Sequence, residues 1–198
     1  AAMDEKTQRL TSQMHKAIAV IQFKLESQLF KKHPEWKMKD RCLFDHIDYR
    51  KGKVEIYGKE YDMTSCHFPT IDPDNPDKLS EEEEILIQKL HHSFMVCEKL
   101  HKHIKVMLQH GCMYAIFNNN LLFHASCPLN EDGSLKEVEI YPGKKFSGRA
   151  LMHHTGMQIR TAFQSDSDPN EKEYAIDYFI YLWCGPESPL FDKSKMAT

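Results

Sequence analysis

The sequence predicts an α+β fold, a helix-rich segment with two long amphipathic helices and a central β-hairpin. Apolar residues recur every three or four positions over residues 4–32 and again over residues 80–111. This is the period of a helix that buries one face. Two short apolar runs flank the three asparagines at 118–120, and apolar runs on either side of an asparagine turn are typical of a hairpin.

The first helix is expected from Asp4 to about Lys32, because this stretch contains neither glycine nor proline. Pro34 disfavours helix in the residue before it, so the helix should end there. A short second helix is then expected from Lys37 to about Ile47.

Two alternating runs on either side of Gly58 and Lys59 predict a small hairpin with a glycine turn. Three prolines within residues 69–80 then predict an extended loop. Ser80 and Glu83 form a capping-box pattern, and the acidic run at 81–84 suits the positive end of a helix dipole. The second long helix should continue to Gly111, and the two long helices could pack together.

The runs CMYAIF and LLFHASC, residues 112–117 and 121–127, are apolar without alternation. Strands covered on both faces have this pattern, so this hairpin should be central and should bury Leu121, Leu122 and Phe123. A short strand is expected at 137–141 and two further helices from about Ser147 to Phe163 and across 174–182. The final FDKSKMAT shows neither a strand nor a helix pattern.

Composition excludes several classes of protein. A formal net charge of −3 and a pI near 6.5 give no electrostatic reason to bind nucleic acid or an anionic membrane surface. No stretch approaches the ~20 apolar residues of a membrane span, and the first residues lack a signal peptide's pattern. Six cysteines without a CxxC spacing argue against a disulfide framework and a zinc knuckle. We expect a cytoplasmic protein with reduced thiols.

His124 is the best single candidate for a functional residue, because it follows a buried strand at the point where sheets present side chains to a crevice. A core histidine bonded to a backbone carbonyl explains the same spacing. Ser126 follows two residues later, and we expect no nucleophilic pair between it and His124.

Two other groups of residues could bind a metal or a phosphate. The pairs His91–His92 and His101–His103 lack the i, i+4 spacing of a metal clamp, and a solvated helix flank explains them better. Gly143, Lys144, Lys145 and Arg149 precede or open a helix and could hold a phosphate, but the spacing is not that of a Walker loop and a solvated turn is the simpler reading.

Three blocks of the sequence resemble a known family. IAVIQFKLES, NNNLLFHASCP and YLWCGPESPLFDKSKMAT are similar, in order and spacing, to blocks of the class III fructose-1,6-bisphosphatases of Firmicutes and related anaerobes. The resemblance covers essentially the whole chain. That family belongs to the calcineurin-like metallophosphoesterases, so it implies an α/β/β/α sandwich around a pair of divalent metals, with manganese as the expected metal.

The family's signatures G-D-x-H-G, G-D-x-x-D-R-G, G-N-H-D and G-H-T do not occur here, since no glycine is followed by aspartate. The resemblance therefore implies an internal segment of the enzyme. Residues 4–111 would form a helical, insert-like or cap-like region with a small hairpin. Residues 112–198 would form part of the metallophosphatase core with the C-terminal helices.

The histidine of the family's LLFHGC-P block is a metal ligand, and His124 is the matching residue. Ala125 departs from the pattern, because the family usually has glycine there. Ser147, Gly148 and Arg149 match an SG[RK] block, with no role implied beyond a helix start. The catalytic and substrate-binding residues would lie outside this chain.

The activity implied for the whole enzyme is metal-assisted hydrolysis of fructose 1,6-bisphosphate to fructose 6-phosphate and phosphate, a step of gluconeogenesis. The segment alone should bind no metal pair tightly and should be inactive. Two alternatives stay open. One is a non-catalytic insert that supports the fold or forms a homo-oligomer, and the other is an independent His/Cys sensor that binds zinc or haem.

Overall fold

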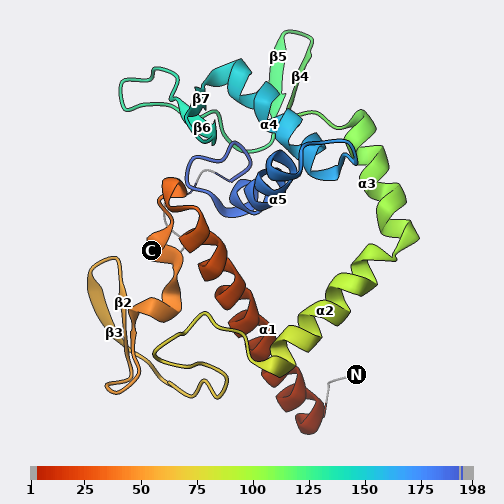
Figure 1. Ribbon diagram of the computed structural model, residues 1–198. Coiled ribbons are helices and arrows are strands. Elements are labelled where there is room, and N and C mark those ends of the chain that lie inside the picture. Colours follow the sequence, from red (N-terminus) through yellow and green to blue (C-terminus); the bar gives the residue numbers. More distant parts are fainter. Residues whose placement is uncertain (1–3, 192, 194–198) are drawn as a thin grey trace. The chain divides into compact units, whose positions relative to one another are not determined.

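A computed structural model describes residues 4–191 and residue 193 (Figure 1). It divides into two compact units, unit 1 up to Val96 and unit 2 from Cys97 onward. The sequence predicts a division after residue 111, into a cap-like helical region and a part of the metallophosphatase core. These two roles stay a prediction. Most of the final FDKSKMAT lies outside the described residues.

Helix α1, Glu5–Lys32, begins and ends where the sequence predicts. The Asp4 carboxylate caps its start by accepting a hydrogen bond from the Thr7 amide at 3.0 Å. Pro34 opens a 3₁₀ turn, η1 (Pro34–Trp36), directly after the helix. The apolar side of the helix is buried in its C-terminal half, at Val20, Ile21 and Phe30, which forms the core of unit 1.

The predicted short helix at 37–47 is wrong. Lys37 has a left-handed backbone with φ of 54°, which stops helix formation at that residue. Two 3₁₀ turns follow, η2 (Lys39–Arg41) and η3 (Leu43–His46). Their tighter winding brings side chains into the core beside α1, including the Phe44 ring, which meets Phe23 edge to face.

A three-stranded antiparallel sheet contains the predicted small hairpin. Its strands are β1 (Ile47–Asp48), β2 (Lys53–Ile56) and β3 (Lys59–Asp62), in that order. Tyr57 and Gly58 both have positive φ, so they form a type I′ turn that matches the twist of the two strands. The hairpin is therefore confirmed, with Gly58 at its turn.

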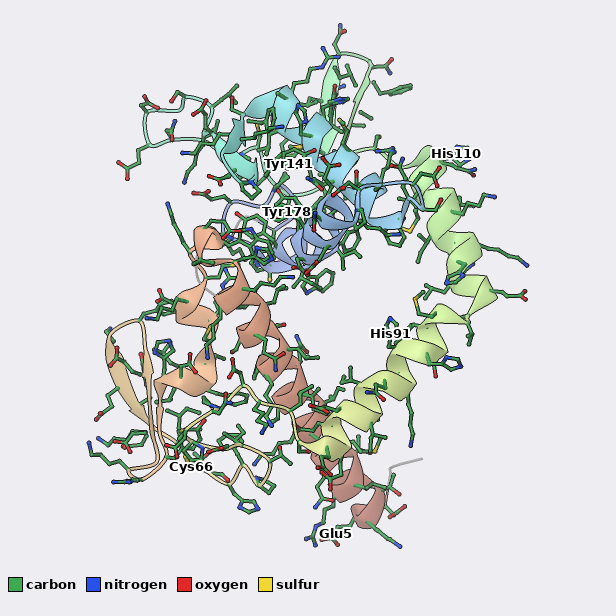
Figure 2. The ribbon with its side chains drawn as sticks, viewed as in Figure 1. Glu5, Cys66, His91, His110, Tyr141 and Tyr178 are labelled. Atoms are coloured by element: carbon green, nitrogen blue, oxygen red, sulfur yellow. The ribbon has the colours of Figure 1, made fainter. Side chains whose placement is uncertain are left out.

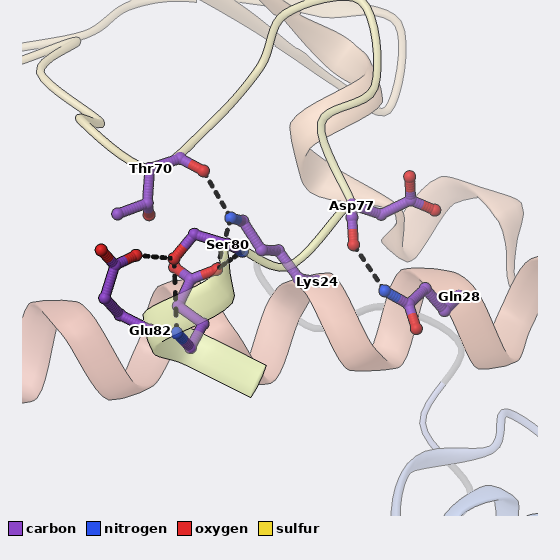
Figure 3. Close-up of polar contacts among 7 residues, drawn as sticks. Lys24, Gln28, Thr70, Asp77, Ser80 and Glu82 are labelled. Atoms are coloured by element: carbon purple, nitrogen blue, oxygen red, sulfur yellow. Dashed lines mark hydrogen bonds and ion pairs between the residues drawn. The ribbon is translucent and has the colours of Figure 1, made fainter. Parts of the chain in front are cut away.

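The loop between this sheet and the next helix is held along one side of α1. Lys24 Nζ donates to the Thr70 carbonyl at 2.6 Å, and Gln28 donates to the Asp77 carbonyl at 2.6 Å (Figure 3). Lys16 Nζ reaches the His67 carbonyl at 2.7 Å in the same way. Successive polar side chains of one helix thus satisfy the carbonyls of a loop that has no strand of its own.

Helix α2 (Glu81–Met95) begins at the predicted capping box. The Ser80 hydroxyl accepts from the Glu83 amide at 3.3 Å, and the Glu83 carboxylate accepts from the Ser80 amide at 2.8 Å. The same carboxylate pairs with Lys24 at 2.8 Å. The start of α2 is therefore tied to the middle of α1.

The predicted continuous helix to Gly111 is wrong, because α2 ends at Met95 and a separate helix, α3 (Glu98–His110), follows in unit 2. Phe94, Met95 and Val96 are 62%, 56% and 60% exposed. Most helical stability in proteins comes from packing of the apolar face, and a β-branched residue is a weak helix former. The exposed apolar residues at 94–96 therefore do not stabilise a helix that continues past Val96.

Unit 2 contains the predicted asparagine hairpin, formed by β4 (Tyr114–Phe117) and β5 (Asn120–Phe123). Asn118 and Asn119 both have positive φ, as a type I′ turn requires. The expected burial is wrong, however, because Leu121, Leu122 and Phe123 are 56%, 54% and 42% exposed. In the described part of unit 2 the pair is a sheet of two strands, so no further strand flanks it.

The core of unit 2 lies between a second hairpin and two helices (Figure 2). Strands β6 (Val138–Tyr141) and β7 (Lys144–Phe146) pair, where the sequence predicted only the first. Helices α4 (Gly148–Phe163) and α5 (Pro169–Cys184) confirm the last two predicted helices. The fully buried members of this core are Val138, Ile140, Leu151, Tyr178 and Leu182.

The described chain thus combines helices with three small antiparallel sheets. The α/β/β/α sandwich implied by the family resemblance stays a prediction. None of the helices in the described part has the length and hydropathy needed to span a membrane. All six cysteines are free, which confirms the expectation of a chain without a disulfide framework.

Candidate functional site

His124 lies in the bend that follows β5, and it is exposed. The strand ends at Phe123, so the backbone turns away from the hairpin at this histidine. A core histidine bonded to a backbone carbonyl is therefore not what the structure shows. The neighbouring Ala125 is exposed as well, and the bend leaves space around both residues.

Two apolar grooves share His124 as a lining residue. One, of about 480 Å³, lies among residues of α3, α4 and α5. The other, of about 510 Å³, is lined by the end of α5 and by Leu190 and Phe191. Phe179 and Leu190 line both grooves. The imidazole therefore sits at the edge of mainly apolar surface, with Cys112 among the residues that line the first groove.

The segment after α5 is fixed next to His124 by buried hydrogen bonds. The Ser188 hydroxyl, fully buried, donates to the Leu182 carbonyl at 2.7 Å and accepts from the Leu190 amide at 3.1 Å. The Ser126 amide donates to the Pro189 carbonyl at 3.2 Å. Ser126 thus fixes the chain just after His124 to the segment that lines the grooves, through its backbone rather than as a nucleophile.

The described residues do not supply a complete metal site. No group of three or more His, Cys, Asp or Glu side chains in residues 4–191 and 193 is placed to hold an ion. A single imidazole cannot fix a metal pair, since even a catalytic zinc site takes three protein ligands. By themselves, these residues therefore do not fit the implied pair of metals.

The histidine pairs and the basic turn lie elsewhere. His91, His92, His101 and His103 are all exposed on helices. The Lys144 ammonium lies 5.6 Å from the centre of the Tyr141 ring. The Gly143 amide, in the turn between β6 and β7, donates to the Glu139 carboxylate at 2.9 Å. Gly143, Lys144 and Lys145 are exposed, as expected of a solvated turn, and α4 starts directly after Ser147 as expected.

One titratable group escaped the sequence reasoning. The His154 ring stacks on Phe146 with centroids 3.7 Å apart, and its Nδ1 is buried without a hydrogen-bond partner in the described chain. Partial burial, helped by the positive charges of His153 and Lys144, lowers the pKa of His154 below its ordinary value. The sequence shows His154 only as a second histidine beside His153. Helical periodicity does not tell which of the two side chains packs against a strand.

Fold and site together describe a helix-rich chain with antiparallel hairpins and one exposed histidine at a strand end. Over residues 1–198 the sequence matches the family described as Firmicute fructose-1,6-bisphosphatase. The chain belongs to this family. No solved structure matches it.

Curated relatives extend well beyond this chain. A "Fructose-1,6-bisphosphatase class 3" of Parabacteroides distasonis is 53% identical over 197 residues, which is 100% of this chain and 29% of that protein. Proteins of the same name from Bacteroides thetaiotaomicron and Clostridium novyi are 50% and 48% identical, over 98% and 96% of this chain. The chain spans about 29% of the length of the first two relatives and 28% of the third.

Proposed function

We propose that this chain is part of a longer, cytoplasmic fructose-1,6-bisphosphatase that hydrolyses the 1-phosphate of fructose 1,6-bisphosphate in gluconeogenesis. The products are fructose 6-phosphate and inorganic phosphate. The proposal rests on family membership over residues 1–198. It rests also on the names of relatives that align with nearly the whole chain at about 50% identity. Six free thiols agree with a reducing compartment.

Within that enzyme, His124 is one ligand of a divalent metal pair of the calcineurin-like metallophosphoesterase type, with manganese as the expected metal. Its place in a bend after a strand, exposed to an incoming group, supports this role. We place the other ligands in polypeptide outside residues 1–198, as the family resemblance implies. In the part of the chain that the structure describes, no three-ligand group accompanies His124.

The test uses the longer protein that contains this chain. Phosphate release from fructose 1,6-bisphosphate should require added Mn²⁺ after chelation. His124→Ala should lower kcat by at least about 100-fold, since even outer partners of a ligand cost 10- to 100-fold. His103→Ala, an exposed histidine of the same unit, is the matched control and should leave turnover unchanged.

Each outcome decides a separate claim. Failure of the longer protein to release phosphate with Mn²⁺ would remove the proposed activity. Equal turnover of the two histidine variants would remove His124 from the metal site while leaving the activity in place. The purified 198-residue chain should show no metal-dependent turnover, and measurable turnover by it would show that its own residues suffice.

A second, structural role is favoured for unit 1. Leu10 and Met14 on α1 and Phe94 on α2 are 56%, 62% and 62% exposed, and the buried polar groups of this unit serve to join its own elements. Deleting residues 4–96 from the longer protein discriminates the roles. Retained activity with a changed oligomer size would favour a supporting or homo-oligomerising insert, whereas lost activity in a folded remainder would favour a direct part in catalysis.

A further inference from the structure

The guanidinium of Arg160, on α4, is held in a fixed orientation. Its Nη1 donates to the Gly156 carbonyl at 2.9 Å, and its Nη2 donates to the Gly111 carbonyl at 3.0 Å. Gly156 lies one turn earlier on α4, and Gly111 caps the end of α3. A Cβ placed on Gly156 would lie 3.3 Å from Nη1, so the glycine leaves space for the guanidinium against the helix. Two hydrogen bonds from one rigid, planar group fix its plane as well as its position.

Most of the binding capacity of this guanidinium is unused. A guanidinium has five N–H donors, and the two carbonyls accept from two of them. Both of these partners are uncharged. Within residues 4–191 and 193, Arg160 forms no ion pair with a carboxylate. Three donors and the positive charge are therefore available to an anion.

Arg160 and His124 line the same groove, whose volume is about 480 Å³. Small-molecule sites typically measure ~300–1,000 Å³. None of the described residues that line this groove is acidic, and its other lining residues are apolar side chains, two glycines and Cys112. Apolar walls exclude water, which strengthens the attraction between a cation and an anion. The charge of the groove is therefore complementary to a small anion that also has a carbon skeleton to lay against the walls.

We propose that Arg160 binds the 6-phosphate of fructose 1,6-bisphosphate and is a specificity-determining residue of the longer enzyme. The inference rests on the proposed function, which places hydrolysis of the 1-phosphate beside His124. A substrate with one phosphate beside His124 has its second phosphate within the reach of the same groove. Arg160 is the one arginine or lysine among the described residues that line it.

Arginine suits this role because its N–H groups pair with two phosphate oxygens at once. The carbon skeleton of the sugar would lie against the apolar walls of the groove, between the two phosphates. The family resemblance placed the substrate-binding residues outside this chain. Arg160 adds one such residue within it.

Binding of fructose 6-phosphate to the longer protein tests the contact without turnover, because this product keeps only the 6-phosphate. In isothermal titration calorimetry, Arg160→Met should raise the Kd at least ~10-fold, since each hydrogen bond to a charged group contributes about that factor or more. Arg149→Met is the matched control, because Arg149 is also an exposed arginine of α4 but lines a different groove. It should leave the Kd unchanged. An unchanged Kd for Arg160→Met, or no binding by the unsubstituted protein, would overturn the inference.

A second measurement separates a phosphate contact from a structural role, because Arg160 also joins the end of α3 to α4. Fructose 1-phosphate has the same scissile bond but lacks the 6-phosphate. Arg160→Met should lower kcat/KM for fructose 1,6-bisphosphate at least ~10-fold more than kcat/KM for fructose 1-phosphate. Arg160→Lys, which keeps the charge without the planar fork, should restore part of this preference. Equal losses on the two substrates would assign Arg160 a structural role only and would contradict the inference.

The outcomes also separate the inference from the proposed function. A longer protein that binds fructose 6-phosphate through Arg160 but releases no phosphate from the bisphosphate loses the proposed activity and keeps the contact. A protein that hydrolyses fructose 1,6-bisphosphate equally well with arginine or methionine at this position keeps the activity and loses the contact.

Discussion

The ion pair between Lys24 and Glu83 shows what a single residue does in unit 1. The Lys24 side chain is 0% exposed and the Glu83 side chain 8%, and Lys24 also donates to the Thr70 carbonyl. A buried ammonium needs such partners, because an unpaired charge inside a protein is costly. One lysine thereby joins α1, the proline-rich loop and the capping box of α2.

Lys24→Met should destabilise unit 1 by about 3–5 kcal/mol, because it leaves the Glu83 charge buried without its partner. Denaturant unfolding followed by circular dichroism measures this. Lys16→Met is the matched control, since the Lys16 ammonium also donates to a loop carbonyl but lies on an exposed residue, and it should change stability by less than about 1 kcal/mol. Similar losses for both variants would show that the buried pair has no special role.

The same pair predicts a dependence on pH. Burial raises the pKa of Glu83, but hydrogen bonds from Lys24, Thr70 and the Ser80 amide outweigh it, so the pKa lies below its ordinary value of 4.5. A lowered pKa in the folded state adds stability above pH 4.5 that is lost as pH falls through the folded pKa.

Unfolding measured between about pH 6 and about pH 3 should therefore show a smaller deficit for Glu83→Gln, relative to the unsubstituted chain, as the pH falls. Glu84→Gln, on the exposed side of the same turn, is the matched control for the loss of a carboxylate. A Glu83→Gln deficit that does not change with pH would contradict the lowered pKa.

At the scale of elements, the ends of helices depend on particular residues. Helix α5 begins at Pro169 and is capped by Asp168, whose carboxylate accepts from the amides of Asn170 and Glu171. It ends at Gly185, where an added Cβ would lie 2.6 Å from both the carbonyl oxygen and the ring of Tyr181. Tyr181 is only 4% exposed, so it has little room to move.

Gly185→Ala should consequently cost about 1–3 kcal/mol, the usual cost of forcing an atom into packed space. The measurement is the midpoint of thermal or denaturant unfolding. Gly156→Ala is the matched control, because it lies inside α4, where an added Cβ meets only side-chain atoms at 3.3 Å or beyond and alanine favours helix. A loss at Gly156 as large as that at Gly185 would refute a specific clash at the end of α5.

Elements with strong local signals were predicted well from sequence. The capping box at Ser80, the stop at Pro34 and the asparagine turn at 118–119 all confirm their predictions. Each of them rests on contacts between residues a few positions apart, which the sequence displays directly. The break at Val96 was missed because it depends on whether a distant partner covers an apolar stripe. The 3₁₀ turns after Lys37 were missed because the left-handed backbone of this lysine has no signal in its residue type.

At the scale of the whole molecule, each unit contains one tryptophan. Trp36 in unit 1 is 5% exposed and Trp183 in unit 2 is 78% exposed. Trp183→Phe should leave blue-shifted fluorescence that acrylamide quenches poorly, whereas Trp36→Phe should leave red-shifted fluorescence that it quenches well. Equal quenching of the two variants would contradict the burial of Trp36, and circular dichroism controls for folding of each variant.

For the candidate site, the sequence predicted the residue but not its surroundings. His124 was found from its place after an apolar strand, and the structure puts it in a bend at the edge of two grooves. Its surroundings were not foreseeable, because Phe179 and Leu190 approach it from more than 50 residues away along the chain. Its role as a ligand stays a proposal, since it depends on residues beyond those 198.

By itself, the sequence determined helices α1, α4 and α5, the capping box at Ser80, the two hairpins that turn at Gly58 and at the asparagines, and the family to which the chain is similar. These follow from local periodicity and from turn and cap residues, which act over a few positions. Only the tertiary structure decided that Lys24 is buried against Glu83, that the second long helix is broken at Val96 and that the β4–β5 hairpin is exposed. Burial depends on which distant segment packs against a surface. An apolar pattern predicts that a face will be covered, but it does not show whether residues of this chain cover it.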